Sequence, residues 1–142
     1  MKIGAHFQSE FALNKARVAS GEIEHGVDVP CKPTGFGSET NGGEFLCLAL
    51  AACYVNDVYR EAERRGIRIE VIQVWAEAEF GGEGEPAKHL SYRVRATAGE
   101  VEEGTVRDLL THVDRVAEIH NTLRMAVAVT LTSVEIRTVW PL

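Results

Sequence analysis

Residues 41–66 read NGGEFLCLALAACYVNDVYREAERRG. Asn41 stands three residues before Glu44, which predicts a capping box at the start of a helix. Every residue from Phe45 to Val55 is apolar, and an amphipathic pattern then continues to Gly66, a residue typical of a helix end. A helix that is apolar on all sides is buried on all sides, and a chain of 142 residues rarely covers one alone. The stretch therefore predicts a long central helix that is covered in part by a second copy of the chain.

Shorter patterns on both sides of this helix predict strands and one more helix. Period-two alternation favours strands, and clusters of Gly and Pro favour the turns between them. The expected elements are strands at 11–19 and 27–29 with turns at Ser20-Gly21 and His25-Gly26, a loop at 30–43, the central helix, a β-hairpin of 68–80 and 90–96 around a turn at 81–86, a helix at 105–119, and a last strand at 126–139. This order predicts an α+β fold in a single domain, 1–142, with an antiparallel sheet and the helices on one face.

The composition limits the partners of the chain. A formal net charge of -6 argues against a nucleic-acid groove, which needs a basic face. No apolar run reaches the roughly 18 residues of a membrane span, and residues 1–20 lack the apolar core of a signal peptide. We therefore expect a cytoplasmic protein that binds neither nucleic acid nor membranes. The glycine-containing loops lack a phosphate-binding pattern and the five histidines lack metal-ligand spacing, so we expect no cofactor and no metal.

Three cysteines, Cys31, Cys47 and Cys53, are the main candidates for chemistry. An odd number in a reducing compartment predicts free thiols. Six residues of helix rise about 9 Å, so Cys47 and Cys53 are too far apart for a disulfide within one helix. Cys53 is either a small buried side chain, as most free cysteines are, or a reactive thiol.

The predicted central helix resembles that of the OsmC/Ohr family. Three stretches carry the resemblance: Thr40-Asn41-Gly42-Gly43-Glu44, Ala51-Ala52-Cys53 and the exit Arg65-Gly66-Ile67. That family's pattern is a Gly-rich loop, a capping residue, an acidic residue, a Leu/Ala-rich helix with Ala-Ala-Cys, and an exit near Arg-Gly-Ile. The hairpin, helix and strand that follow also occur in the family's order, so the resemblance covers nearly the whole chain. It implies an OsmC-like fold, an intertwined homodimer, and a peroxidase whose central-helix thiolate attacks organic hydroperoxides. Cys53 matches the position of that thiolate.

The sequence departs from the family pattern in three places. The family's second cysteine, in a Cys-Pro motif that resolves the oxidised thiol, is absent, and His120 most nearly occupies its position. Gly42-Gly43 replaces the family's Pro-Glu, and Glu44 follows one place later, either as a helix cap or as a catalytic residue. Arg17 is the nearest candidate for the family's arginine, although a solvated strand residue is the favoured interpretation. His120 lowers the pKa of the Cys53 thiol as an ion pair or acts as a base, or it only interacts with a helix dipole.

These observations leave three hypotheses. The first is a thiol-dependent peroxidase that reduces small organic hydroperoxides through Cys53 in oxidative stress defence, with Glu44, His120 and Arg17 as further catalytic candidates. Either an external thiol reductant or Cys31 would then replace the missing second cysteine. The second is a dimeric binding protein for a small apolar ligand that has lost peroxidase turnover. The third is a dimer without a small-molecule role, in which Cys53 belongs to the core.

Overall fold

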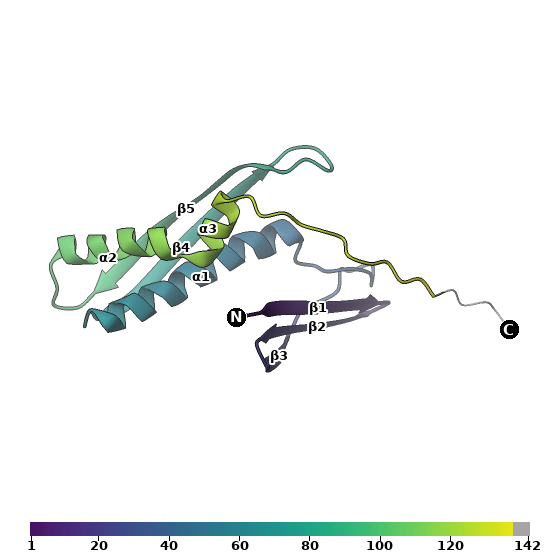
Figure 1. Cartoon of the computed structure of the whole chain (residues 1–142), viewed down its shortest axis with the longest axis horizontal. Coiled ribbons are helices and arrows are strands. Elements are labelled where there is room, and N and C mark those ends of the chain that lie inside the picture. The colour runs from purple at the N-terminus through teal and green to yellow at the C-terminus, as the bar shows by residue number, and fades with distance from the viewer. Residues whose placement is uncertain (138–142) are drawn as a thin grey trace. The chain divides into compact units, whose positions relative to one another are not determined.

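The structure, a computed structural model, describes residues 1–137 and confirms the expected α+β class. It contains a three-stranded and a two-stranded sheet, both built from neighbouring strands of the chain (Figure 1). The elements are β1 (Ile3–Glu10), β2 (Leu13–Ser20), β3 (Ile23–Val27), α1 (Gly42–Arg64), β4 (Ile69–Phe80), β5 (Ala87–Ala98), α2 (Glu103–Val116) and α3 (Glu118–Arg124). The described residues form two compact units, one of Met1–Ala52 and Val74–Val94, the other of Cys53–Gln73 with residues 95–137.

The first unit begins with an antiparallel meander of β1, β2 and β3. The register runs from Ile3 opposite Ser20 to Glu10 opposite Leu13, and β2 then pairs with β3. The expected strand at 11–19 corresponds to β2, and the turn at Ser20-Gly21 is confirmed by the left-handed Gly21. The expected turn at His25-Gly26 is wrong, because Gly26 pairs with Arg17 inside β3. No strand was expected at 3–10, where β1 lies.

The central helix begins and ends as its sequence predicts. The backbone N–H of Asn41 donates to Glu44 Oε2 at 2.7 Å, and the backbone N–H of Glu44 donates to Asn41 Oδ1 at 2.9 Å. This reciprocal pair confirms the capping box and satisfies backbone donors that the first helical turn leaves free. Gly66 ends the helix with φ +65°, a conformation that glycine adopts without strain.

The β-hairpin is also confirmed, with β4 and β5 close to the expected ranges. Within it, the Arg93 guanidinium lies 3.9 Å from the centre of the Trp75 ring, a cation–π contact. None of the described helices is long and apolar enough to cross a membrane.

The core of the second unit joins the later half of α1 to α2. Its largest completely buried side chains are Tyr54, Val58, Leu109 and Val113. The α1 pair is four residues apart, and so is the α2 pair, so each helix contributes one face to this core.

The expected helix at 105–119 is wrong as a single element, because Ala117 interrupts it. Ala117 has an extended backbone (φ -66°, ψ 114°) and separates α2 from α3. The side-chain amide of Asn121 donates to the Arg115 carbonyl at 3.0 Å, which satisfies an acceptor that the end of α2 leaves free. An apolar repeat continues through such a one-residue break, so periodicity alone does not reveal it.

The expected last strand at 126–139 is wrong over the described residues 127–137, which have no regular secondary structure; residues 138 and 139 lie outside the described part. Val- and Thr-rich sequence favours a strand only where a neighbouring strand accepts its hydrogen bonds. Between residues 1 and 137, neither of the two sheets includes this segment. Its apolar side chains are exposed, with Val129 at 99% and Leu131 at 82%.

The apolar run of α1 is only partly covered within one chain. Leu50 and Tyr54 are buried, whereas Leu48 is 61% exposed and Phe45 lies at the surface. Within a single chain, apolar side chains in the first half of α1 therefore remain exposed to solvent. A second subunit was expected to cover part of this helix.

Candidate active site

Cys53 lies in α1 and carries a half-buried free thiol. Its sulfur donates a hydrogen bond to Oδ2 of Asp57 over 3.8 Å. The two residues are four apart, so their side chains share one face of the helix. Because Asp57 is only 4% exposed, the immediate neighbour of the thiol is a buried carboxyl group.

Glu118 brings a second carboxyl group to the thiol from the first turn of α3. The Cys53 sulfur and one oxygen each of Asp57 and Glu118 lie within 4.8 Å of one another. The backbone N–H of Ile119 also forms a hydrogen bond with the thiol. The Glu118 carboxyl group and the Ile119 N–H both belong to the first turn of α3. The break at Ala117 therefore brings them toward α1.

Arg60 supplies positive charge to this acidic cluster. Its Nη1 lies 2.8 Å from Asp57 Oδ1 and 3.9 Å from Glu118 Oε1, and its Nε lies 3.3 Å from Glu61 Oε1. A thiol and two carboxylates are ligand types that can bind a divalent cation. Here the Arg60 guanidinium forms ion pairs with both carboxyl groups, so a cation from the chain itself already balances their negative charge.

The electrostatics of the cluster favour the protonated thiol. Burial raises the pKa of Cys53, and the negative charges of Asp57 and Glu118 raise it further, while the hydrogen bond from Ile119 lowers it. Burial also raises the pKa of Asp57; Glu118 adds to this rise and Arg60 opposes it. Cys53 therefore rests as a thiol at neutral pH, beside a carboxyl group that is a better proton acceptor than a free aspartate.

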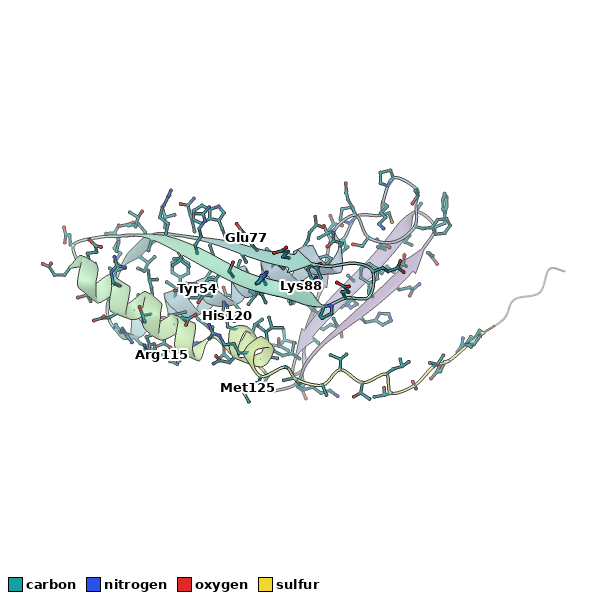
Figure 2. The ribbon with its side chains drawn as sticks, turned by 90° about the horizontal axis from the view of Figure 1, so that it is seen from above. Tyr54, Glu77, Lys88, Arg115, His120 and Met125 are labelled. Carbon is teal, nitrogen blue, oxygen red and sulfur yellow. The ribbon has the colours of Figure 1, made fainter. Side chains whose placement is uncertain are left out.

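Tyr54, the next residue after Cys53, connects all three helices of this unit. Its side chain is 1% exposed, and its hydroxyl donates to the Leu110 carbonyl of α2 at 2.8 Å. Its ring packs against the ring of His120 in α3, with centroids 6.0 Å apart (Figure 2). Burial, with a smaller contribution from Asp114, raises the pKa of Tyr54 to about 12, so the hydroxyl keeps its proton.

Two of the residues predicted for the site, Glu44 and Arg17, lie in the first unit. Glu44 is half of the capping box, in agreement with its structural interpretation. Arg17 lies on β2 and forms an exposed ion pair with Glu24 on β3. That pair accounts for Arg17 as a surface strand residue, which was the favoured interpretation.

His120 lies in α3 and is only 3% exposed. Burial lowers its pKa, Arg124 lowers it further, and Asp114 opposes them. Burial thus works against the imidazolium that an ion pair with the Cys53 thiolate needs. From α3, the Glu118 side chain lies within 4.8 Å of the Cys53 sulfur.

The other two cysteines are also free thiols. Cys31 lies in the loop before α1, where it pairs with Ser38 in an isolated β-bridge. Cys47 lies in α1 and is partly buried. Both belong to the first unit, whereas Cys53 belongs to the second.

Three residues of the cluster, Asp57, Arg60 and Glu118, were not predicted as site residues. A sequence signal existed for two of them, because Asp57 and Arg60 follow Cys53 by four and seven residues, the spacing of one helix face. No local signal pointed to Glu118, because its approach depends on the break at Ala117.

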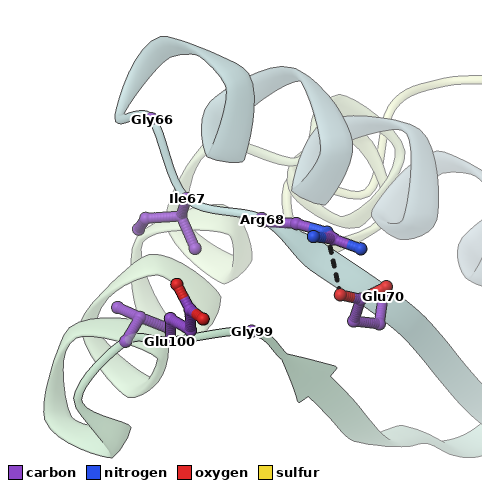
Figure 3. Close-up of a pocket in the computed structure, with 7 residues that line it drawn as sticks. Gly66, Ile67, Arg68, Glu70, Gly99 and Glu100 are labelled. Carbon is purple, nitrogen blue, oxygen red and sulfur yellow. Dashed lines mark ion pairs between the residues drawn. The ribbon is translucent and has the colours of Figure 1, made fainter.

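A cleft of about 440 Å³ in the second unit lies apart from the thiol cluster. It is formed by the connections after α1 and after β5, and none of its lining residues belongs to the cluster (Figure 3). Arg68 and Glu70 form an ion pair of 2.8 Å along its wall. The cleft is therefore a charged surface feature and not the access route to Cys53.

The fold and the site define an α+β thiol protein, in which a long helix presents a half-buried cysteine to a cluster of charged groups. The family described as OsmC-like protein matches residues 35–132, a range that contains α1, the hairpin, α2 and α3. The chain belongs to this family. No curated protein matches the sequence.

Solved structures of family members share the fold at low sequence identity. An OsmC-like protein from Mycoplasma pneumoniae is 16% identical with a TM-score of 0.61, and the match covers 87% of this chain and 86% of that one. The organic hydroperoxide resistance protein OhrB of Bacillus subtilis is 12% identical with a TM-score of 0.53, over 87% and 91% of the two chains. An OsmC-like protein of unknown function from Vibrio cholerae is 10% identical with a TM-score of 0.62, over 86% and 93%. Proteins that share this fold thus include one named for organic hydroperoxide resistance and one of unknown function.

The lowered pKa of His120 predicts a specific dependence of stability on pH. Below about pH 6.5, His120 binds a proton more readily in the unfolded chain than in the folded protein. The free energy of unfolding therefore falls as the pH falls. The variant His120→Gln lacks this titration. We expect its urea-unfolding free energies, measured from about pH 7 to about pH 5, to fall less steeply than those of the wild type. The variant His25→Gln, at an exposed position, serves as the control for the loss of a histidine. Parallel profiles for His120→Gln and the wild type would contradict the assignment.

Proposed function

We propose that this protein is a thiol-dependent peroxidase that reduces small organic hydroperoxides through Cys53, in defence against oxidative stress. The observation that carries the proposal is the contact between the Cys53 thiol and the Asp57 carboxyl group, with Arg60 and Glu118 beside them. Peroxide reduction by a thiol needs a sulfur nucleophile and groups that move protons near it. Membership of a family that includes organic hydroperoxide resistance proteins supports the same reaction class.

The missing second cysteine affects how Cys53 is regenerated. Thiol attack on a hydroperoxide gives a sulfenic acid, which a second thiol converts to a disulfide. We propose that an external thiol performs this step and that a second molecule of it then releases Cys53. Cys31 is the alternative resolving thiol within the chain.

One observation favours a second candidate function. Since the pKa of Cys53 is raised, the resting thiol is a poorer nucleophile than a thiolate. A protein that keeps the fold but has lost turnover would be a binding protein for a small apolar ligand, and a thermal shift with such a ligand would support this alternative.

We further propose that the chain, as one OsmC-like domain, assembles into a homodimer through the exposed apolar part of α1. Fully burying a leucine side chain contributes about 1.5–3 kcal/mol, so exposed positions such as Leu48 favour association.

The peroxidase proposal predicts which cysteine matters. With cumene hydroperoxide as substrate and dithiothreitol as reductant, the wild type is expected to consume peroxide catalytically. The rate of the variant Cys53→Ser is expected to fall to that of the uncatalysed reaction, because a serine hydroxyl is a much weaker nucleophile than a cysteine sulfur. Cys47→Ser, on the same helix, is the matched control and keeps wild-type turnover. Turnover that survives in Cys53→Ser would contradict the proposal.

The dimer proposal predicts the effect of a charge in the apolar run. By light scattering at micromolar concentration, the wild type is expected at twice the mass of one chain. Leu48→Asp should shift it toward the monomer, because a carboxylate is costly to bury. Asn56→Asp adds the same charge at an exposed position of α1 and should remain dimeric. A monomeric wild type would overturn this proposal.

A further inference from the structure

Asp57 is a buried residue whose carboxyl group lies beside the Cys53 sulfur. It lies one turn after Cys53 in α1, and its Oδ2 accepts the hydrogen bond of the thiol over 3.8 Å. Its other oxygen, Oδ1, is held at 2.8 Å by Arg60. One carboxylate oxygen therefore faces the thiol proton, while the other is fixed in place by a guanidinium.

We propose that Asp57 is a catalytic residue that accepts the proton of the Cys53 thiol and then donates it to the alcohol that leaves. This inference rests on the proposed peroxidase function and names a proton carrier for it. No other carboxyl group in the described part of the chain has a hydrogen bond from the Cys53 sulfur.

The proposed step is balanced in atoms and electrons. The S–H proton moves to Asp57 Oδ2, and the thiolate attacks the terminal oxygen of the hydroperoxide ROOH, the one that carries the hydrogen. A new S–O bond forms as the O–O bond breaks, so sulfur is oxidised to a sulfenic acid by two electrons and the peroxide is reduced. The leaving alkoxide RO⁻ takes the proton from Asp57, and the net change is thiol plus ROOH to sulfenic acid plus ROH.

The groups that face Asp57 come from two helices. Cys53 and Arg60 face it from α1, and Glu118 faces it from α3. The negative charge of Glu118 beside Asp57 favours the protonated form of Asp57. The raised pKa of Asp57 agrees with this geometry and brings the group closer to the range in which a residue both accepts and releases a proton.

Glu118 and Arg60 act as positioning residues in this scheme. Arg60 forms ion pairs with both carboxyl groups: its Nη1 lies 2.8 Å from Asp57 Oδ1, which it orients, and 3.9 Å from Glu118 Oε1. The charge of Glu118 makes both Asp57 and Cys53 harder to ionise. Removing that charge should thus move the pH dependence of the reaction without abolishing the reaction.

The test compares two reactions of the same thiol in the full-length protein. Alkylation of Cys53 by iodoacetamide needs only the thiolate, whereas oxidation by cumene hydroperoxide also needs an acid for the leaving group. The charge of Asp57 raises the pKa of the thiol, so Asp57→Asn should alkylate at least as fast as the wild type at neutral pH. Its oxidation should be slower by about 100-fold or more, the usual loss when a general acid–base group is removed.

Matched variants separate chemistry from folding. Asp57→Glu keeps a carboxyl group and should recover much of the oxidation rate that Asp57→Asn loses. Glu118→Gln should keep oxidation but shift its pH profile toward lower pH, because the pKa values of Asp57 and Cys53 both fall. Glu63→Gln, at an exposed carboxylate of the same helix, should match the wild type in both reactions.

Each outcome decides the question. Slower oxidation with undiminished alkylation in Asp57→Asn, restored in Asp57→Glu, supports the proposal. Oxidation that stays at the wild-type rate in Asp57→Asn, or oxidation and alkylation that decline together, overturns the role of Asp57 while the peroxidase function stands. A wild type whose Cys53 alkylates normally but resists the hydroperoxide overturns the peroxidase function and the role of Asp57 with it.

Discussion

The burial of Tyr54 is the constraint on which the thiol site depends. Its hydroxyl is bonded to the Leu110 carbonyl of α2 and its ring packs on His120 of α3, so one side chain fixes α1 against both later helices. Tyr54 follows Cys53 directly, and with α1 held in this rotation Asp57 lies beneath the thiol and Glu118 reaches it from α3. A buried hydroxyl needs such a partner, because an unpaired one would cost free energy.

The central helix was predictable because its signals are local. The capping box of Asn41 and Glu44 and the exit at Gly66 are read within a few residues, and so is the β4–β5 hairpin. The features that were missed depend on distant partners. The strand expected after Ala126 requires a neighbouring strand, and the approach of Glu118 to Cys53 requires a break at Ala117 that the apolar repeat does not mark. Family resemblance pointed to Cys53, and helix spacing could have added Asp57 and Arg60, whereas Glu118 became visible only in three dimensions.

The environment of Cys53 differs from that of a thiol activated by a nearby cation. Burial and two carboxyl groups keep the proton on sulfur, and the cationic Arg60 contacts the carboxyl groups. In the proposed mechanism, Cys53 passes its proton to Asp57 when a substrate arrives and needs no thiolate at rest. Because oxidation follows thiolate character and exposure, we expect the resting thiol to oxidise slowly with unspecific oxidants.

The most direct test of the central claim, that Cys53 is a reactive thiol, is intact-mass analysis of the reduced protein after one equivalent of cumene hydroperoxide. Dimedone present in the reaction would trap a sulfenic acid, and peptide mapping would locate it. The proposed function predicts prompt modification at Cys53, or a disulfide between Cys31 and Cys53. An unmodified Cys53, under conditions that oxidise a free thiol in solution, would show that the family fold persists here without peroxidase chemistry.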